Sequence, residues 1–326
     1  MSSVELVNCH THTIFSDGAS TLEENMEAAL AAGITTVACT DHWGKPDFID
    51  CSIKAEKLSE YFERIASVRK LYPTLEIISG IEADWYHGCE NDLRALRTLG
   101  SLRNLDPLRN LDPLRDLDSL HDLGPLRDLD SLHDFGSLRD LDSLPTDPKE
   151  ENDFRPTFFL GSIHYLQEKP IDWDEHTEIW EELGANALWC LYVKEWCQAA
   201  TSGLFDSMAH PDLPRMFSTE GYCPTIDLTP LYKEMAEAAH AGKVHVEINT
   251  AGLIKSFKDF YPHEALLTEF FKAGVPLTIG SDAHHASRMG DHILEAYRYA
   301  RSIGYTQIDV PTTTGNWRQI SLENLK

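Results

Sequence analysis

The chain alternates short apolar segments with segments of helical periodicity, and this alternation limits the folds open to it. Residues 4–9 predict a strand, Thr21 and Glu24 predict a capping box at the start of a helix, and Gly33 predicts the end of that helix. A second apolar segment, residues 34–39, follows at once. Strands and helices in this order are typical of parallel βα units.

Five further apolar segments continue the pattern, so the sequence predicts seven strands in all. These five are residues 75–81, 157–163, 205–209, 243–248 and 276–280. Further helices are predicted at residues 54–71, 228–241, 263–273 and 291–302. We therefore expect a single domain over residues 1–326, built as a closed α/β barrel of seven strands.

The regular pattern stops at residues 96–143, where a leucine-rich unit of six residues repeats with drift. Leucines three apart precess around an α-helix, and Pro107, Pro113 and Pro125 would each break one. We interpret the segment as an insertion into the barrel that forms a flexible or loosely helical surface excursion. A segment that binds a protein partner is the alternative.

Charge and cysteine content limit the partners and the compartment. The formal net charge of −25 would repel phosphate backbones and anionic lipid, so we expect neither nucleic acid nor membrane as a partner. Seven cysteines without a CxxC pair indicate reduced thiols. No apolar run reaches the ~18 residues of a membrane span, and the N-terminus lacks a signal-peptide pattern. These features predict a soluble, cytoplasmic protein.

Metal-binding types of residue follow the C-terminal ends of six of the seven predicted strands, and active sites of α/β barrels lie at that face. His10 and His12 form the strongest pair, because side chains two apart on an extended segment point to the same side. A single histidine after a strand is more often a capping or core residue. Glu82 and Asp282 would each be costly to bury alone, so contact with a metal explains all these residues together.

Six short motifs, in order along the chain, resemble those of the PHP family, named for polymerase and histidinol phosphatase. They are His10-Thr11-His12, Thr40-Asp41-His42, Gly80-Ile81-Glu82, Gly161-Ser162-Ile163-His164, Ala209-His210-Pro211-Asp212 and Ser281-Asp282-Ala283-His284. The resemblance implies a distorted (β/α)7 barrel. Residues 247–253 most resemble the histidinol-phosphatase branch. That likeness implies hydrolysis of L-histidinol phosphate to L-histidinol and phosphate, a step of histidine biosynthesis.

Carried over motif by motif, the resemblance implies three divalent metal ions, which could be Zn, Mn or Fe. The implied ligands are His10, His12, Glu82 and Asp282 for the first ion, Glu82, His164 and His210 for the second, and Asp17, His42 and His284 for the third. Under this hypothesis a hydroxide shared by two ions attacks the phosphorus, and no protein nucleophile is needed.

A phosphate ester also needs cationic groups, and Arg215, Lys255 and Arg288 are the candidates, since each lies shortly after a strand end. Candidates to contact the rest of the substrate are Glu247, Trp43, Trp85 and Tyr86. Asn8 stands where many family members have an acidic residue, which predicts weaker support for His10.

Two other functions remain open at this point. One is a phosphoesterase of the same family that acts on a nucleotide or on phosphotyrosine. The other is a metal-binding protein that acts through an interaction of the hexad segment.

Overall fold

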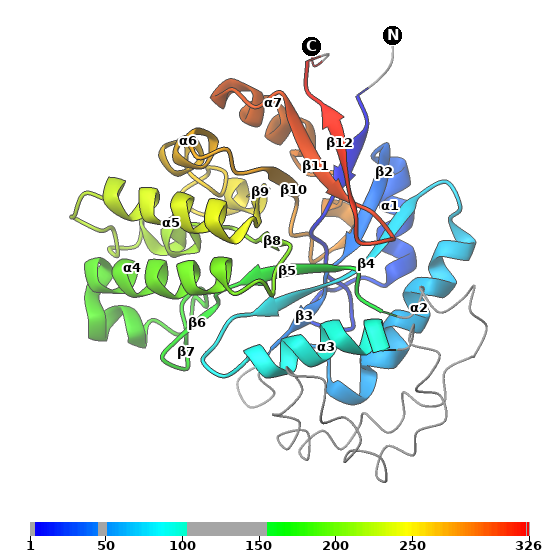
Figure 1. Cartoon of the computed structure of the whole chain (residues 1–326), viewed down its shortest axis with the longest axis horizontal. Coiled ribbons are helices and arrows are strands. Elements are labelled where there is room, and N and C mark those ends of the chain that lie inside the picture. Colours follow the sequence, from blue (N-terminus) through cyan, green and yellow to red (C-terminus); the bar gives the residue numbers. More distant parts are fainter. Residues whose placement is uncertain (1–3, 45–50, 103–154, 324, 326) are drawn as a thin grey trace, which may run out of the picture.

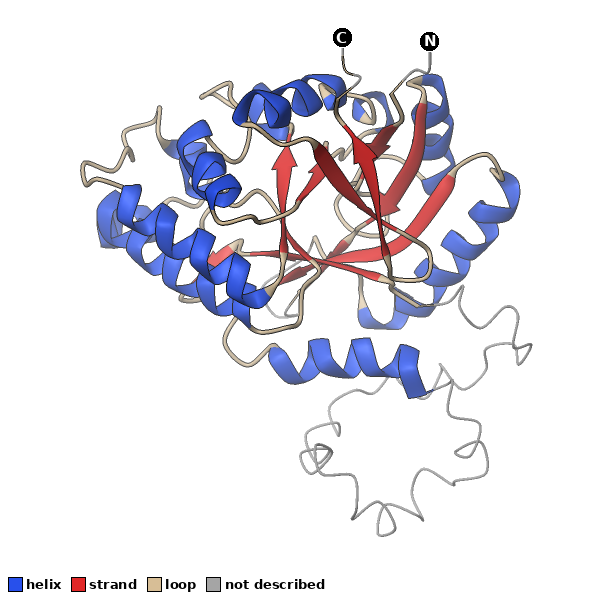
Figure 2. Cartoon of the chain, turned by 45° about the horizontal axis from the view of Figure 1, so that its top comes forward, coloured by secondary structure: helices blue, strands red, loops and turns tan. Residues whose placement is uncertain are grey.

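Parallel strands form the centre of the molecule and helices cover their outside (Figure 2). The computed structural model describes residues 4–44, 51–102, 155–323 and 325. The strands lie side by side in the order β1 (Leu6–Asn8), β2 (Ile34–Cys39), β4 (Glu76–Asp84), β5 (Phe158–Ser162), β8 (Ser207–Met208), β9 (His245–Asn249) and β10 (Leu277–Gly280), and the short β3 (His42–Trp43) pairs with β4.

The two edges of this sheet, β1 and β10, are joined by backbone hydrogen bonds just beyond the strand ends. The Asp282 N–H donates to the His10 carbonyl at 3.0 Å, and the His12 N–H donates to the Ala283 carbonyl at 2.9 Å. The sheet is therefore a nearly closed barrel of seven parallel strands, which confirms the predicted (β/α)7 architecture. The seam of the barrel passes directly through the first and last metal-type motifs.

The helices surround the barrel (Figure 1). They are α1 (Leu22–Ala31), α2 (Leu58–Leu71), α3 (Glu90–Leu102), α4 (Glu178–Thr201), α5 (Thr229–Gly242), α6 (Glu264–Lys272) and α7 (Ile293–Ile303). The longest, α4, buries Trp180, Trp189 and Trp196 completely or nearly so. It changes direction at Gly184, whose φ of 70° only glycine adopts readily. None of the described helices is long and apolar enough to cross a membrane.

A hairpin that the sequence did not predict covers the end of the barrel where the strands begin. It consists of β11 (Gln307–Pro311) and β12 (Trp317–Ser321). The Trp317 ring stacks on His245, the first residue of β9, with centroids 3.6 Å apart, and meets the edge of Phe158, the first residue of β5. Since this end is covered, a ligand must approach from the end where the strands finish.

Only the start of the predicted hexad segment lies within the described residues. Residues 96–102 are the last part of α3, and the Leu96 side chain is 7% exposed, so the segment begins as a continuation of a core helix. Residues 103–143 lie outside the described part of the chain. A flexible excursion and a partner-binding segment both stay predictions.

The capping box predicted at the start of α1 is confirmed. The Thr21 hydroxyl accepts the Glu24 N–H at 3.2 Å, and the Glu24 carboxylate accepts the Thr21 N–H at 2.8 Å. We expect Thr21→Ala to lower the free energy of unfolding by about 1 kcal/mol, because one N–H of the first turn loses its acceptor. Urea denaturation of the wild type and Thr21→Ala measures this difference. Thr21→Ser, which keeps the hydroxyl, is the control. Equal stability of Thr21→Ala and the wild type would contradict the capping role.

Candidate metal centre

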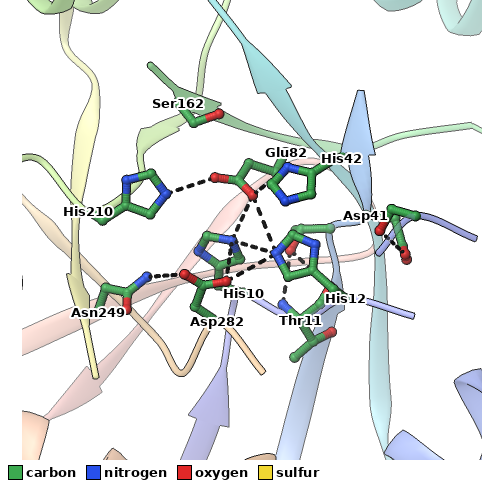
Figure 3. A network of polar contacts seen from close by, with 12 residues as sticks. His10, Thr11, His12, Asp41, His42, Glu82, Ser162, His210, Asn249 and Asp282 are labelled. Carbon is green, nitrogen blue, oxygen red and sulfur yellow. Dashed lines mark hydrogen bonds and ion pairs between the residues drawn. The ribbon is translucent and has the colours of Figure 1, made fainter. Parts of the chain in front are cut away.

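The nine side chains that the sequence predicts as metal ligands come together at the end of the barrel where the strands finish. Figure 3 shows six of them, His10, His12, His42, Glu82, His210 and Asp282. His10 and His12 follow β1, Asp17 lies between β1 and α1, His42 begins β3, Glu82 lies in β4, His164 follows β5, His210 follows β8, and Asp282 and His284 follow β10. The barrel therefore positions residues from distant parts of the chain, because parallel strands all end at one face.

Glu82 lies at the centre of the group, with a side chain that is 1% exposed. Its Oε2 lies 3.0 Å from His10 Nε2 and 3.3 Å from His12 Nε2. Its Oε1 lies 3.0 Å from His210 Nε2 and 3.6 Å from His164 Nε2. Burial acts to raise the pKa of Glu82, but the surrounding imidazoles outweigh it and hold that pKa well below its usual value. Oε2 also lies 3.1 Å from His42 Nδ1, so the two oxygens face two different sets of histidines, as a bridging carboxylate requires.

Two buried carboxylates fix the histidines from behind. Glu247 Oε1 lies 2.8 Å from His10 Nδ1, and Asp84 Oδ1 lies 2.7 Å from His164 Nδ1. A neutral ring that donates from Nδ1 presents the lone pair of Nε2 to the centre of the site. Carboxylate partners of this kind are typical of metal-binding histidines, because they set both tautomer and ring orientation.

The inward nitrogens also lie within hydrogen-bond distance of one another. His10 Nε2 lies 3.0 Å from His12 Nε2, and His164 Nε2 lies 3.3 Å from His210 Nε2. Two lone pairs at such a distance repel each other unless a proton or a cation lies between them. Neutral imidazoles together with carboxylates form a donor set that divalent metal ions accept. The residues therefore fit a metal site.

A third set of candidate ligands surrounds Asp17 at the mouth of the site. Asp17 Oδ2 lies 3.3 Å from His284 Nε2 and 3.7 Å from His42 Nε2, and Asp17 Oδ1 lies 3.7 Å from His12 Nδ1. Burial lowers the pKa of His42 to about 4, so this ring is neutral at pH 7. His12 thus presents one nitrogen to Glu82 and the other to Asp17.

Three groups have ligand atoms within 4.8 Å of one another, and two histidines occur in more than one group. The groups are His10, His12 and Asp282; His42, Glu82 and His164; and His12, Asp17, His42 and His284. The motif-by-motif assignment placed His12 and His42 in one set each, whereas the structure lets each contribute to two. Asp282 and His284 reach different groups, although they are only two residues apart.

Glu247 was expected near the substrate, and the structure places it behind the ligands instead. Its side chain is 1% exposed, and its Oε2 accepts the His210 N–H and the Asn249 side-chain amide, both at 3.0 Å. A Cβ on Gly280 would lie 2.0 Å from Glu247 Oε1, so glycine is required there. The signal in the sequence was the spacing of Glu247 and Asn249, which turns both side chains to one side of a strand.

The contacts of Asn8 do not test its predicted effect on His10, which stays a prediction. Its amide donates to the Ser281 hydroxyl at 2.6 Å and to the Met289 carbonyl at 2.9 Å. Its carbonyl oxygen accepts the Ser281 N–H at 3.0 Å. Asn8 therefore ties β1 to the segment after β10, while Glu247 supports the His10 ring.

A cavity of about 220 Å³ opens above the ligands, and of the three predicted cationic residues Lys255 lines it. Within the described part of the chain, the Lys255 ammonium pairs with no carboxylate. The Arg215 guanidinium lies elsewhere, bound to Asp259 Oδ2 at 2.7 Å and to the Phe260 carbonyl at 2.8 Å. Arg288 pairs with Asp291 at 3.0 Å and does not line the cavity.

The three aromatic candidates, Trp43, Trp85 and Tyr86, do not line this cavity either. Trp85 is 6% exposed, and its indole N–H donates to Glu195 at 3.1 Å. The aromatic wall comes instead from Tyr165, Trp173 and Tyr261, which no motif in the sequence indicated.

We expect Glu247→Gln to lower metal affinity by about ten- to a hundred-fold. The amide has one oxygen for the N–H donors of the His10 ring, the His210 backbone and the Asn249 side chain, so at least one donor must face its NH₂ group. Metal content after dialysis against graded chelator concentrations measures the effect. Glu237→Gln, an exposed change on α5, is the control and should retain metal as the wild type does; equal retention by Glu247→Gln would contradict the supporting role.

Comparison with known proteins agrees with this geometry. The PHP domain model matches residues 8–251. The Deinococcus radiodurans protein named "Probable histidinol-phosphatase" is 27% identical over 304 residues, which is 92% of this chain and 94% of that protein. Histidinol phosphate phosphatase from Lactococcus lactis subsp. lactis, solved with Zn, L-histidinol and phosphate, has the same fold, with a TM-score of 0.66 and 17% identity over 96% of this chain and 98% of that one. Because the family match covers most of its length, the chain belongs to the PHP domain family.

Proposed function

We propose that the protein is a metal-dependent phosphomonoesterase that hydrolyses L-histidinol phosphate to L-histidinol and phosphate. The observation that carries the proposal is the position of Glu82, whose two oxygens face separate sets of histidines at the open end of the barrel. The names of the relative from D. radiodurans and of the structure from L. lactis support the choice of substrate.

We assign three divalent ions to the nine ligands. The proposed sets are His10, His12, Glu82 and Asp282; Glu82, His164 and His210; and Asp17, His42 and His284, with His12 and His42 available to neighbouring ions. Bound divalent ions would supply positive charge for the phosphate oxygens and lower the pKa of water at the site.

The protein's own residues prepare this site in three ways. Glu247 and Asp84 hold the rings of His10 and His164 in one orientation, so no reorganisation is needed when substrate arrives. Lys255 lines the cavity and forms no ion pair with a carboxylate of the described residues, and we assign it to a phosphate oxygen. The buried Tyr261 hydroxyl lines the cavity without a hydrogen-bond partner in the described structure, and we assign it as a second donor.

We expect the purified protein to release phosphate from L-histidinol phosphate. Exhaustive chelation should abolish the activity, and Mn²⁺ or Zn²⁺ should restore it, because the ligand set binds such ions. Phosphate release is measured on a panel that also contains nucleoside monophosphates and phosphotyrosine. Full activity after metal removal would contradict the mechanism, and a ten-fold or greater preference for another ester would contradict the substrate.

We expect Lys255→Gln to raise KM about ten-fold, since an ionic hydrogen bond to phosphate is replaced by a neutral one. Lys258→Gln removes an exposed charge three residues further along the chain and should leave KM unchanged. Steady-state kinetics of the two variants separate a specific contact from a general loss of positive charge. Equal effects of both substitutions would contradict the role of Lys255.

A further inference from the structure

The cavity wall contains one carboxylate that the metal ligands and their supports do not use. Asp172 lies between β7 (Lys169–Pro170) and α4, and it lines the cavity. Its Oδ1 is buried and has no hydrogen-bond partner in the described structure. A buried carboxylate oxygen without a partner is costly, so a ligand that supplies a partner gains affinity.

The backbone next to Asp172 is held on both sides. The Ile171 N–H donates to the His164 carbonyl at 2.9 Å, and the Trp180 indole N–H donates to the Ile171 carbonyl at 3.0 Å. The Ile171 side chain itself is fully buried. Asp172 is therefore fixed at the cavity wall through its neighbour, and its carboxylate needs little ordering when a ligand binds.

The position of Asp172 relative to the candidate ligands argues against a role as a metal ligand. None of the three groups with ligand atoms within 4.8 Å of one another includes it. Asp84, which also lines the cavity, supports a ligand, since its Oδ1 lies 2.7 Å from His164 Nδ1. Asp172 is thus the carboxylate of the described cavity wall that remains available to a ligand other than a metal.

The rest of the wall shows what such a ligand must carry. Lys255 presents a positive charge to the same cavity, so a ligand with a negative end and a positive end matches both residues. Trp173 follows Asp172, lines the cavity and is 38% exposed, which leaves part of its ring open to contact. An aromatic face beside a carboxylate attracts ammonium or imidazolium groups.

We infer that Asp172 binds the positively charged group of the substrate and that, with Trp173, it selects phosphate esters that carry a cation over neutral ones. The inference rests on the proposed phosphomonoesterase activity, which brings the phosphate end to the metals and Lys255. For L-histidinol phosphate the group in question is its ammonium or its imidazole ring.

The test compares charged and neutral esters on Asp172→Asn, which keeps the shape of the side chain and removes its charge. We expect KM for L-histidinol phosphate to rise about ten-fold or more. Turnover of p-nitrophenyl phosphate, which carries no cation, should stay within about two-fold of the wild type. Asp174→Asn removes an exposed charge from the same connection and is the matched control. It should change neither KM for L-histidinol phosphate nor turnover of p-nitrophenyl phosphate. Metal content is measured for all three proteins.

Two results would overturn the inference. An equal loss of activity toward both esters would show a structural role, and a loss of bound metal from Asp172→Asn would show that Asp172 is a ligand. A paired measurement on 2-aminoethyl phosphate and 2-hydroxyethyl phosphate keeps this test independent of the natural substrate. Wild-type preference for the amino ester that Asp172→Asn abolishes supports the inference even if L-histidinol phosphate is not hydrolysed, an outcome that would overturn only the proposed function.

Discussion

The whole site depends on burying the Glu82 carboxylate among histidine rings. An isolated charge at 1% exposure would be too costly to keep, so Glu82 must be matched by protons or cations on both of its oxygens. Glu247 and Asp84 extend this requirement outward, since each adds a buried negative group behind a ring that already faces Glu82. The carboxylates raise the pKa of His10, His12 and His164, so these rings hold protons that balance the buried charge unless divalent ions replace them. The interior of the barrel therefore requires positive charge among these rings before any substrate is considered.

The barrel makes this concentration of charge possible. Parallel strands bring residues from distant parts of the chain to one end, and the β11–β12 hairpin covers the other end with Trp317. The ligands face a cavity whose remaining charges are few and of both signs, which favours a small zwitterionic ester over a polymer. We also expect the net charge of −25 to disfavour a polyanion as substrate.

The sequence predicted what depends on local order and missed what depends on register. Strand and helix periodicity, the Thr21 capping box and the metal-type residues at strand ends could all be recognised along the chain. The pairing of Asp84 with His164 could not, because it follows from the register in which Asp84 lies opposite Ser162 across β4 and β5. Arg215 resembled a phosphate-binding residue because its true partner could not be seen in the sequence. That partner, Asp259, lies 44 residues further along, in a loop whose position only the folded barrel sets.

The seam between β1 and β10 has a consequence for the lifetime of the fold. Few backbone bonds close it, and the side chains of His10 and Asp282 approach each other directly across it, with Nε2 and Oδ1 3.5 Å apart. An ion held by both would act as a cross-link between the first and last strands, closing a loop of most of the chain. Native stability would then rise with the logarithm of free metal concentration. In a metal-starved cell, such a protein would be degraded faster as well as being inactive.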